Sequence, residues 1–324
     1  MISGGPARVA PLNARGATMM PRSSNPASDG LWVILGGGGM LGRAWSESLR
    51  ADPPPGGWRA LTRAQCDITS EADAAAAIAP GVGVVVNAAA WTDVDGAEAD
   101  EAGALRVNAD GPAILAERCQ TVGALLVHYS TDYVFDGAAA TPYRVDHPRA
   151  PINAYGRSKA AGEERIESSG CDHLIVRTSW LYAAHGGNFV NTIARACRAK
   201  PSLRVVADQI GRPTSCDSLV AATRRLIAAG ARGAQHACDA GECSWFDLAR
   251  AIARRVNPAC RVEPCATDEF PRPAPRPAYS VLDLSATEAL IGPLTPWPDA
   301  LARTLDRMTQ EDAAEAAAPG RRSA

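Results

Sequence analysis

The sequence of 324 residues lacks several features that mark particular classes of protein. No run approaches the ~18 consecutive apolar residues that a transmembrane helix needs. Lysine and arginine (33) nearly balance aspartate and glutamate (35), so the net charge is −2, and the basic residues are scattered rather than clustered. A polybasic membrane patch and a nucleic-acid footprint both need such a cluster. We therefore expect neither a membrane nor a nucleic acid as partner.

A compact cysteine framework is also absent. The nine cysteines are an odd number and are spread along the chain, which favours reduced thiols in a cytoplasmic protein over disulfides. The pairs Cys238-x4-Cys243 and Cys260-x4-Cys265 are spaced more widely than the ligand pairs of most structural zinc sites. We predict buried thiols at these positions and no metal site.

Both ends of the chain differ in composition from the rest. Residues 1–29 are rich in Gly, Pro, Ala, Ser and Arg and have no apolar core, which predicts a disordered extension rather than a signal peptide. Residues 310–324 are rich in alanine and charge and predict a disordered, frayed tail. The chain as a whole is 46% hydrophobic and 21% charged, which is typical of a globular protein with a sizeable core.

Short apolar runs alternate with helical patterns in the first half of the chain. The runs at 31–35, 58–61, 82–86, 123–129 and 173–177 predict strands, and the patterns at 71–78, 105–120 and 155–168 predict helices. This alternation predicts an α/β fold with a doubly wound parallel sheet, a Rossmann-type NAD(P)-binding domain over residues 30–180. Residues 181–309, where proline becomes frequent, predict mainly a smaller substrate-binding lobe, with some elements returning to the first sheet.

A glycine-rich turn separates the first predicted strand from a helix. Its spacing is Gly36-x-x-Gly39-x-x-Gly42, with Met40 and Leu41 inside it. Glycines at this spacing let the backbone approach a pyrophosphate, whose charge then lies at the helix N-terminus. A flexible glycine loop without a ligand is the alternative, but a strand before and a helix after are the context that a dinucleotide-binding turn requires.

The end of the second predicted strand bears on which dinucleotide is bound. An acidic residue that would hold the ribose of NAD is missing there, and Arg63 could instead accept a 2′-phosphate. This favours NADPH, with NADH as the alternative, although Arg63 could also be an exposed loop arginine. Asp67, followed by Ile68, could lie near an adenine amine or could be a turn or helix-cap aspartate.

Small and polar residues follow the third predicted strand. Ala88, Ala89 and Ala90 leave room for a flat cofactor along the sheet edge, unless they only permit close packing of helix and sheet. The segment from Thr92 through Asp95 comes next, where ligands of parallel sheets bind. Acids at the positive end of a helix would explain the same segment without a ligand.

A hydroxyl and a tyrosine–lysine pair complete the polar set. Thr131 and Asp132 end the fourth predicted strand, at the same sheet edge, although Ser, Thr and Asp are also ordinary turn residues. In Tyr155-Gly-Arg-Ser-Lys159 the phenol and the ammonium lie one helical turn apart and share a helix face. A nearby lysine charge is expected to lower the tyrosine pKa and make the phenol a proton donor or acceptor near neutrality.

With these pieces in place the chain resembles the extended short-chain dehydrogenases/reductases, and among them the dTDP-4-dehydrorhamnose reductases. The resemblance covers roughly Leu31 to Asp306. It depends on five strings in family order: Val-Asn87-Ala-Ala-Ala-Trp-Thr92-Asp-Val94-Asp95-Gly-Ala-Glu98, Ser130-Thr131-Asp132-Tyr-Val-Phe-Asp-Gly137, Tyr155-Gly-Arg-Ser-Lys159-Ala-Ala-Gly-Glu163, Arg177-Thr-Ser-Trp180-Leu-Tyr182 and Asp208-Gln209-Ile-Gly-Arg-Pro213-Thr214.

The resemblance implies roles for these residues. Thr131, Tyr155 and Lys159 would form the catalytic set, with Asp132 supporting Thr131. The expected substrate contacts are Thr92, Val94, Asp95, Thr131, Trp180 and Arg276. The expected cofactor contacts are Gly36, Gly39, Met40, Leu41, Gly42, Arg63, Asp67, Ile68, Ala88, Ala89, Ala90, Asn108, Tyr155 and Lys159.

The resemblance also implies a reaction, the NADPH-dependent reduction of dTDP-4-dehydro-L-rhamnose, a nucleotide sugar, with Tyr155 as proton donor. A related nucleotide-sugar 4-ketoreductase of different C4 stereochemistry, or one from a secondary-metabolite pathway, remains an alternative. So does a non-catalytic NADP-binding regulatory subunit, although such a protein would be expected to lose members of the catalytic set. Some relatives bind a divalent ion at a dimer contact, but the acids that would hold it are not matched here. We expect no metal, and a homodimer is compatible with the resemblance.

Overall fold

The computed structural model describes Met1 and residues 30–317 of the chain. Its centre is a six-stranded sheet in the order β10-β5-β4-β3-β1-β2, and every neighbouring pair is parallel. The expected extension at 1–29 lies outside the described residues apart from its first residue. The strands of the sheet are β1 (Leu31–Leu35), β2 (Trp58–Leu61), β3 (Val82–Asn87), β4 (Leu125–Thr131), β5 (His173–Thr178) and β10 (Gly233–His236).

Helices cover both faces of this sheet, which explains why β3 and β4 are buried along their whole length. One face packs against α1 (Met40–Ala51) and α8 (Cys216–Ala228) through Trp45, Leu49 and Leu226. The other face packs against α2 (Glu71–Ala77), α5 (Gly111–Val122) and α6 (Ala154–Ser168). The predicted doubly wound α/β fold is therefore confirmed.

The strand order reverses between β1 and β3, because β2 lies on one side of β1 and β3 on the other. Ligands of doubly wound folds bind at such a switch point, beyond the carboxyl ends of the strands. The glycine turn after β1 and the alanines after β3 flank this point. Beyond β3 the chain forms α3 (Val94–Ala99) and α4 (Glu101–Leu105), and a π-helical turn (Arg106–Asp110) divides the single helix expected over 105–120.

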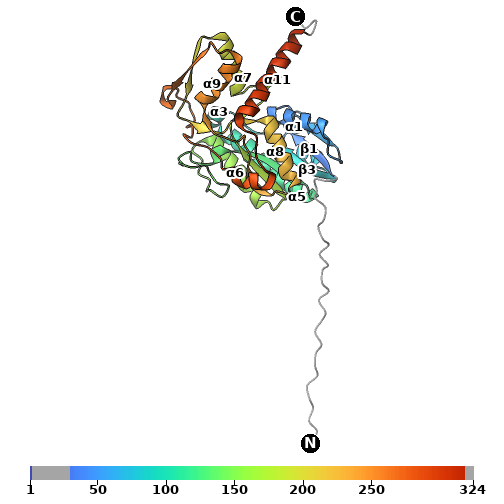
Figure 1. The fold of residues 1–324 in the computed structure, drawn as a ribbon. Helices are drawn as coiled ribbons and strands as arrows, with labels where there is room; N and C mark the ends of the chain where they lie inside the picture. The colour runs from blue at the N-terminus through green and yellow to red at the C-terminus, as the bar shows by residue number, and fades with distance from the viewer. Residues whose placement is uncertain (2–29, 318–324) are drawn as a thin grey trace.

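A second lobe has its own core, built around Val190, Leu248, Ile252 and Leu301. In Figure 1 its helices α7 and α9 lie together, away from β1 and β3, and α11 runs out to the C-terminus. The lobe contains a two-stranded parallel sheet of β7 and β12. Its elements are β6 (Leu181–Tyr182), α7 (Phe189–Ala199), β7 (Ser202–Val206), β8 (Ile210–Gly211), β9 (Thr214–Ser215), β11 (Cys243–Ser244), α9 (Trp245–Val256), β12 (Arg261–Cys265) and α11 (Trp297–Ala317).

Three elements of the C-terminal half return to the first domain. β10 is the sixth strand of the large sheet, and α8 and α10 (Ser285–Ile291) pack on the same face as α1. The C-terminal helix α11 continues to Ala317, so the first part of the segment expected as a frayed tail is helical, and its last part, 318–324, lies outside the described residues. Among the described helices none is long and apolar enough to cross a membrane.

Candidate active site

The glycine turn forms one wall of a cavity of about 290 Å³. Gly36 has φ +78°, and a Cβ there would lie 2.7 Å from the backbone nitrogen of Ala89. A Cβ on Gly42 would lie 2.2 Å from the carbonyl oxygen of Gly36, so both positions require glycine. Helix α1 starts at Met40 with no acidic residue in its first turn, and its N-terminus is therefore free to bind an anion. The cradle fits a dinucleotide pyrophosphate.

Most of the predicted cofactor contacts line this cavity. They are Gly36, Gly39, Arg63, Asp67, Ile68, Ala88, Ala89 and Ala90. Met40, Leu41 and Gly42 belong to the first turn of α1, directly beyond the glycine turn.

Two charged residues that line the cavity, Arg63 and Asp67, are compatible both with cofactor binding and with a purely structural role. The Arg63 side chain is 86% exposed and lies 3.8 Å from the Asp67 carboxylate, so it is accessible to a phosphate. Asp67 also accepts hydrogen bonds from the backbone nitrogen and hydroxyl of Thr69, at 3.0 and 2.8 Å. The Thr69 bonds hold the pKa of Asp67 below its usual value. Asp67 is thus a turn aspartate that also lines the cavity.

Asn108 stabilises the loop beside this cavity. Its Oδ1 accepts from the backbone nitrogen of Trp91 at 2.8 Å, and its Nδ2 donates to the Trp91 carbonyl and to the Ser158 hydroxyl. Both amide hydrogens are used within the protein, so the side chain orders the loop after β3 rather than donating to a cofactor. A direct cofactor contact, as expected from the sequence, is not favoured by this geometry.

Thr131 and Asp132 form a buried pair at the end of β4. The Thr131 hydroxyl donates to Asp132 Oδ1 at 2.9 Å and accepts from the backbone nitrogen of Tyr133 at 3.2 Å. Burial raises the pKa of Asp132 to about 6, while hydrogen bonds from Ser280 and Thr131 partly offset that effect. Asp132 therefore fixes the orientation of the Thr131 hydroxyl, the arrangement expected from the sequence.

Tyr155 lies in the first turn of α6, where Asn153 caps the helix by accepting from the backbone nitrogen of Gly156 at 2.8 Å. Its ring packs edge-on against Tyr133, with ring centroids 5.9 Å apart. Burial raises the pKa of Tyr155 to about 12, and a hydrogen bond with Thr131 offsets part of the rise. Thr131 and Tyr155 are therefore brought together, and the phenol is protonated at neutral pH.

Lys159 points into the sheet. It is one of two lysines in the chain, and its side chain is 2% exposed. Its Nζ donates to the carbonyl oxygen of Tyr129 at 2.5 Å and lies 3.2 Å from Nε2 of His128. Burial lowers the pKa of Lys159 to about 8. The expectation that Lys159 lowers the pKa of Tyr155 is wrong for this structure, because burial of the phenol dominates.

A second, larger cavity of about 680 Å³ lies beside α3, α7 and the segment 267–276. Two predicted substrate contacts, Asp95 and Arg276, line it and form an ion pair of 2.9 Å. Arg272 lies 3.7 Å from the same carboxylate. Thr92 and Val94 lie where the chain enters α3, whose N-cap Asp93 accepts from the backbone nitrogen of Gly96. The cavity is large enough for a nucleotide sugar.

Trp180, a predicted substrate contact, is not among the residues that line this cavity, but it packs against one that is. Its ring stacks on Trp245, with centroids 3.5 Å apart and planes inclined by 9°. Phe189 packs against the ring of Trp245. Trp245 and Phe189 both line the cavity. Trp180 has φ +48°, and a Cβ on Gly211 would lie 2.5 Å from its indole, so the stack is tightly enclosed.

Several lining residues were not assigned a role from the sequence. They are Phe189, Arg204, Gln209, Trp245, Phe270 and Arg272. Gln209 belongs to one of the five strings that carry the family resemblance, so the sequence did contain a signal for a role at this position. The sequence contains no comparable signal for Trp245, because its role depends on Trp180, which lies far away along the chain.

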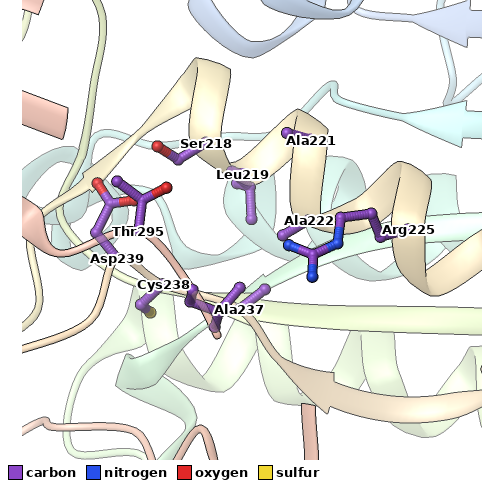
Figure 2. A pocket seen from close by; sticks show the side chains of 10 residues that line it. Ser218, Leu219, Ala221, Ala222, Arg225, Ala237, Cys238, Asp239 and Thr295 are labelled. Atoms are coloured by element: carbon purple, nitrogen blue, oxygen red, sulfur yellow. The ribbon is translucent and has the colours of Figure 1, made fainter. Parts of the chain in front are cut away.

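A third cavity is separate from these two and encloses about 40 Å³. Figure 2 shows it between α8 and the segment that contains Ala237, Cys238 and Asp239. Its volume suffices for water molecules and not for a cofactor. Burial raises the pKa of Asp239 to about 7. No predicted site residue lies among those that line it.

All nine cysteines fall within the described residues, and each is a buried free thiol. Between residues 30 and 317, no group of three or more His, Cys, Asp or Glu side chains is arranged to hold a metal ion.

The dinucleotide cradle at the switch point and the hydrogen-bonded hydroxyls of Thr131 and Tyr155 together place the protein among dinucleotide-binding oxidoreductases. Over residues 32–310 the chain matches the family described as RmlD substrate binding domain, and it belongs to this family. A dTDP-4-dehydrorhamnose reductase of Mycolicibacterium smegmatis is 44% identical over 275 residues, which cover 83% of each chain. The resemblance indicated by the five strings is confirmed.

Two further relatives extend this comparison. A probable dTDP-4,6-dihydroxy-2-methyloxan-3-one 4-ketoreductase of Streptomyces antibioticus is 41% identical and covers 83% of this chain and 92% of its own length. The crystal structure of a dTDP-4-dehydrorhamnose reductase from Bacillus anthracis in complex with NADP superimposes with a TM-score of 0.82 at 35% identity. That match covers 86% of this chain and 99% of the other.

Proposed function

We propose that this protein catalyses the NADPH-dependent reduction of the C4 ketone of dTDP-4-dehydro-L-rhamnose (dTDP-6-deoxy-L-lyxo-4-hexulose) to dTDP-L-rhamnose. The observation that carries the proposal is the 44% identity to a reductase of that name over 83% of both chains. The retention of Thr131, Tyr155 and Lys159 supports a catalytic role over a regulatory one. We further propose a cytoplasmic location, which nine free thiols favour.

The residues at the glycine turn would hold the cofactor. Gly36 and Gly42 leave space for a pyrophosphate at the start of α1, and the exposed Arg63 could bind a 2′-phosphate, which supports NADPH over NADH. When bound, NADPH supplies the hydride. The related structure from Bacillus anthracis is a complex with NADP.

Tyr155 would donate a proton to the substrate oxygen at C4. Its pKa of about 12 keeps the phenol protonated throughout the neutral range, as a proton donor requires. Thr131 would place a second hydroxyl at the same oxygen. With a pKa of about 6, Asp132 is close enough to neutrality to take up a proton, which would free the Thr131 hydrogen for the substrate.

The larger cavity would bind the nucleotide sugar. Arg272 and Arg276 supply positive charge for a diphosphate, and Trp245 and Phe189 supply an apolar wall. The 41% identical relative named as a 4-ketoreductase favours, as second candidate, reduction of another dTDP-linked keto sugar.

The test is to incubate the purified protein with NADPH and dTDP-4-dehydro-L-rhamnose and to follow the loss of NADPH absorbance. NMR of the product then gives the configuration at C4. Oxidation of NADPH with the rhamnose configuration supports the proposal. The other C4 configuration would favour the second candidate, and cofactor binding without turnover would favour a regulatory protein. Light scattering of the same sample tests for a homodimer.

A further inference from the structure

His128 occupies a position between two residues of the site and has no role in the mechanism above. It lies on β4, buried, and its register partner on β3 is Asn87. Nδ1 of His128 lies 3.1 Å from Nδ2 of Asn87, and Nε2 lies 3.2 Å from Nζ of Lys159. The imidazole therefore links the end of β3 to the lysine of α6.

The backbone fixes which ring nitrogen of His128 carries the proton. The backbone nitrogen of Ala89 donates to Oδ1 of Asn87 at 3.1 Å, so the amide oxygen must face Ala89. Nδ2 of Asn87 then donates to Nδ1 of His128, which accepts. Burial and the charge of Lys159 lower the pKa of His128 well below its usual value, so the ring is neutral. Its proton lies on Nε2, facing Lys159.

This tautomer favours one protonation state of Lys159. An ammonium group has three donors and no acceptor, so it opposes the Nε2–H of His128. A neutral amine can accept from Nε2–H with its lone pair and still donate to the carbonyl of Tyr129 at 2.5 Å. The geometry thus favours the amine, in the same direction as the lowered pKa of Lys159.

Other ionisable groups near Lys159 are held by partners of their own. Glu163, one turn further along α6, is ion-paired with Arg177 and Arg149. The phenol of Tyr129 lies on the opposite face of the sheet, bonded to Trp45 and Thr223. The elements packed against α6 carry further charged groups. Those with partners are Asp95 with Arg276, Glu98 with the nitrogen of Ala154, Glu101 with Arg157, Asp110 with Arg165, Arg118 with the carbonyl of Ile78, and Asp132 with Thr131. Arg106 and Glu117 on these elements are exposed to solvent.

We propose that His128 is a positioning residue for Lys159: held in the Nε2–H tautomer by Asn87, it donates to the lysine amine and favours its neutral form. The role in catalysis rests on the proposed function. A pKa of about 8 still leaves most Lys159 as ammonium at neutral pH. When Tyr155 gives its proton to the substrate oxygen, a phenolate remains, and this ammonium, four residues further along α6, would return one proton to it. The neutral amine so formed accepts from His128, which keeps its own proton. Water supplies the one proton consumed per turnover.

Two variants separate this role from a structural one. In Asn87→Asp the carboxylate accepts from both Ala89 and Nδ1–H, which forces the other tautomer, so Nε2 accepts from the ammonium. In His128→Gln the amide oxygen can likewise accept from the ammonium. Both changes should raise the midpoint of the Lys159 titration by at least ~1 pH unit. The second variant keeps the proposal testable if the first does not fold.

The two lysines make the measurement direct. Lysine labelled with carbon-13 at Cε gives two NMR signals, from Lys159 and the exposed Lys200, and Lys200→Arg assigns them. Nitrogen-15 spectra of labelled histidine report the tautomer of His128. The His128 signals are assigned by their absence from the spectrum of the His128→Gln variant. We expect the Nε2–H tautomer in the unmodified protein and upward shifts of the Lys159 midpoint in both variants. His173→Gln, on the neighbouring strand, should leave the Lys159 midpoint unchanged.

Kinetics provide the second readout. The basic limb of the kcat profile should move to higher pH in both variants, whereas loss of structure would lower kcat at every pH. An Nδ1–H tautomer in the unmodified protein, or an unchanged Lys159 midpoint in the folded variants, would overturn the proposal. The protein could show the expected tautomer and the expected shifts of the Lys159 midpoint and yet fail to reduce the sugar. That result would support the role of His128 toward Lys159 and would overturn only the proposed reaction.

Discussion

Arg276 donates a hydrogen bond of 2.9 Å to the carboxylate of Asp95, although the two residues are 181 positions apart in the sequence. The pair lies at the wall of the larger cavity, and its side chains are 17% and 26% exposed. Arg272, at 3.7 Å, is the second cation on the same carboxylate. One acid therefore pairs with two arginines at the wall of the cavity proposed to bind the diphosphate.

Arg276→Ala should weaken binding of the nucleotide sugar more than it slows the chemical step. A hydrogen bond to a charged group contributes about 1.5–3 kcal/mol, so KM should rise ~10–100-fold with a smaller change in kcat. Steady-state kinetics at saturating NADPH measure both constants. Arg232→Ala, which breaks a pair with Asp172 outside both cavities, is the control and should leave KM unchanged. An equal KM in the Arg276 variant would remove this residue from the substrate site.

Tyr155→Phe should lower kcat by ~10²–10⁴-fold, the usual contribution of one acid–base group. Phenylalanine keeps the ring that packs against Tyr133, so the fold and NADPH binding should persist. Fluorescence titration with NADPH checks binding, and the absorbance assay checks turnover. Near-normal turnover would show that another group donates the proton.

Gly42→Ala should reduce NADPH affinity at least ~10-fold, a loss of about 1.4 kcal/mol or more. The new Cβ would lie 2.2 Å from the carbonyl of Gly36 and would distort the turn. Gly38→Ala in the same turn is the matched control, since its Cβ would meet only Thr62, at 3.7 Å. An unchanged NADPH affinity in the Gly42 variant would show that the turn does not bind the pyrophosphate.

Asp239→Asn should stabilise the protein at alkaline pH and have little effect in acid. Burial raises the pKa of Asp239 to about 7 in the folded state, from about 3.9 when unfolded. The folded state therefore holds the proton more tightly, and this group's contribution to stability is full below pH ~4 and lost as pH rises through ~7. An amide oxygen keeps the hydrogen bond from the nitrogen of Ser215 at every pH.

Thermal unfolding measures the effect. The Asp239 variant should melt at least ~2 °C above the unmodified protein near pH ~8 and within ~1 °C of it near pH ~4. Asp172→Asn, at an exposed position, controls for the loss of one carboxylate. The same difference in melting temperature at both pH values would contradict the assignment of this titration to Asp239.

Local patterns predicted the parts of the fold that depend on neighbours in sequence. The strand Leu31–Leu35 and the helix that starts at Met40 could be predicted because an apolar run, a glycine turn and an amphipathic segment follow one another. β10 could not be placed, because its partner β5 lies more than fifty residues earlier and its own pattern is short.

Within the site, residue types were predictable and their electrostatics were not. The spacing of Tyr155 and Lys159 identified the pair, but the sign of the tyrosine pKa shift depends on burial by distant segments. His128 was not predicted because its significance comes from the register between β3 and β4. Asn108 was predicted to contact a cofactor, but the fold uses its amide to hold Trp91.

The return of β10 to the large sheet has a consequence for the order of assembly during synthesis. When the ribosome has released residues up to about Leu181, the sheet lacks its sixth strand and the face bearing α1 lacks α8 and α10. β5 is then an open edge that can pair with another chain. The first domain gains its last strand and its last covering helix only after translation has passed Ile291, so its folding is coupled to the synthesis of the second lobe.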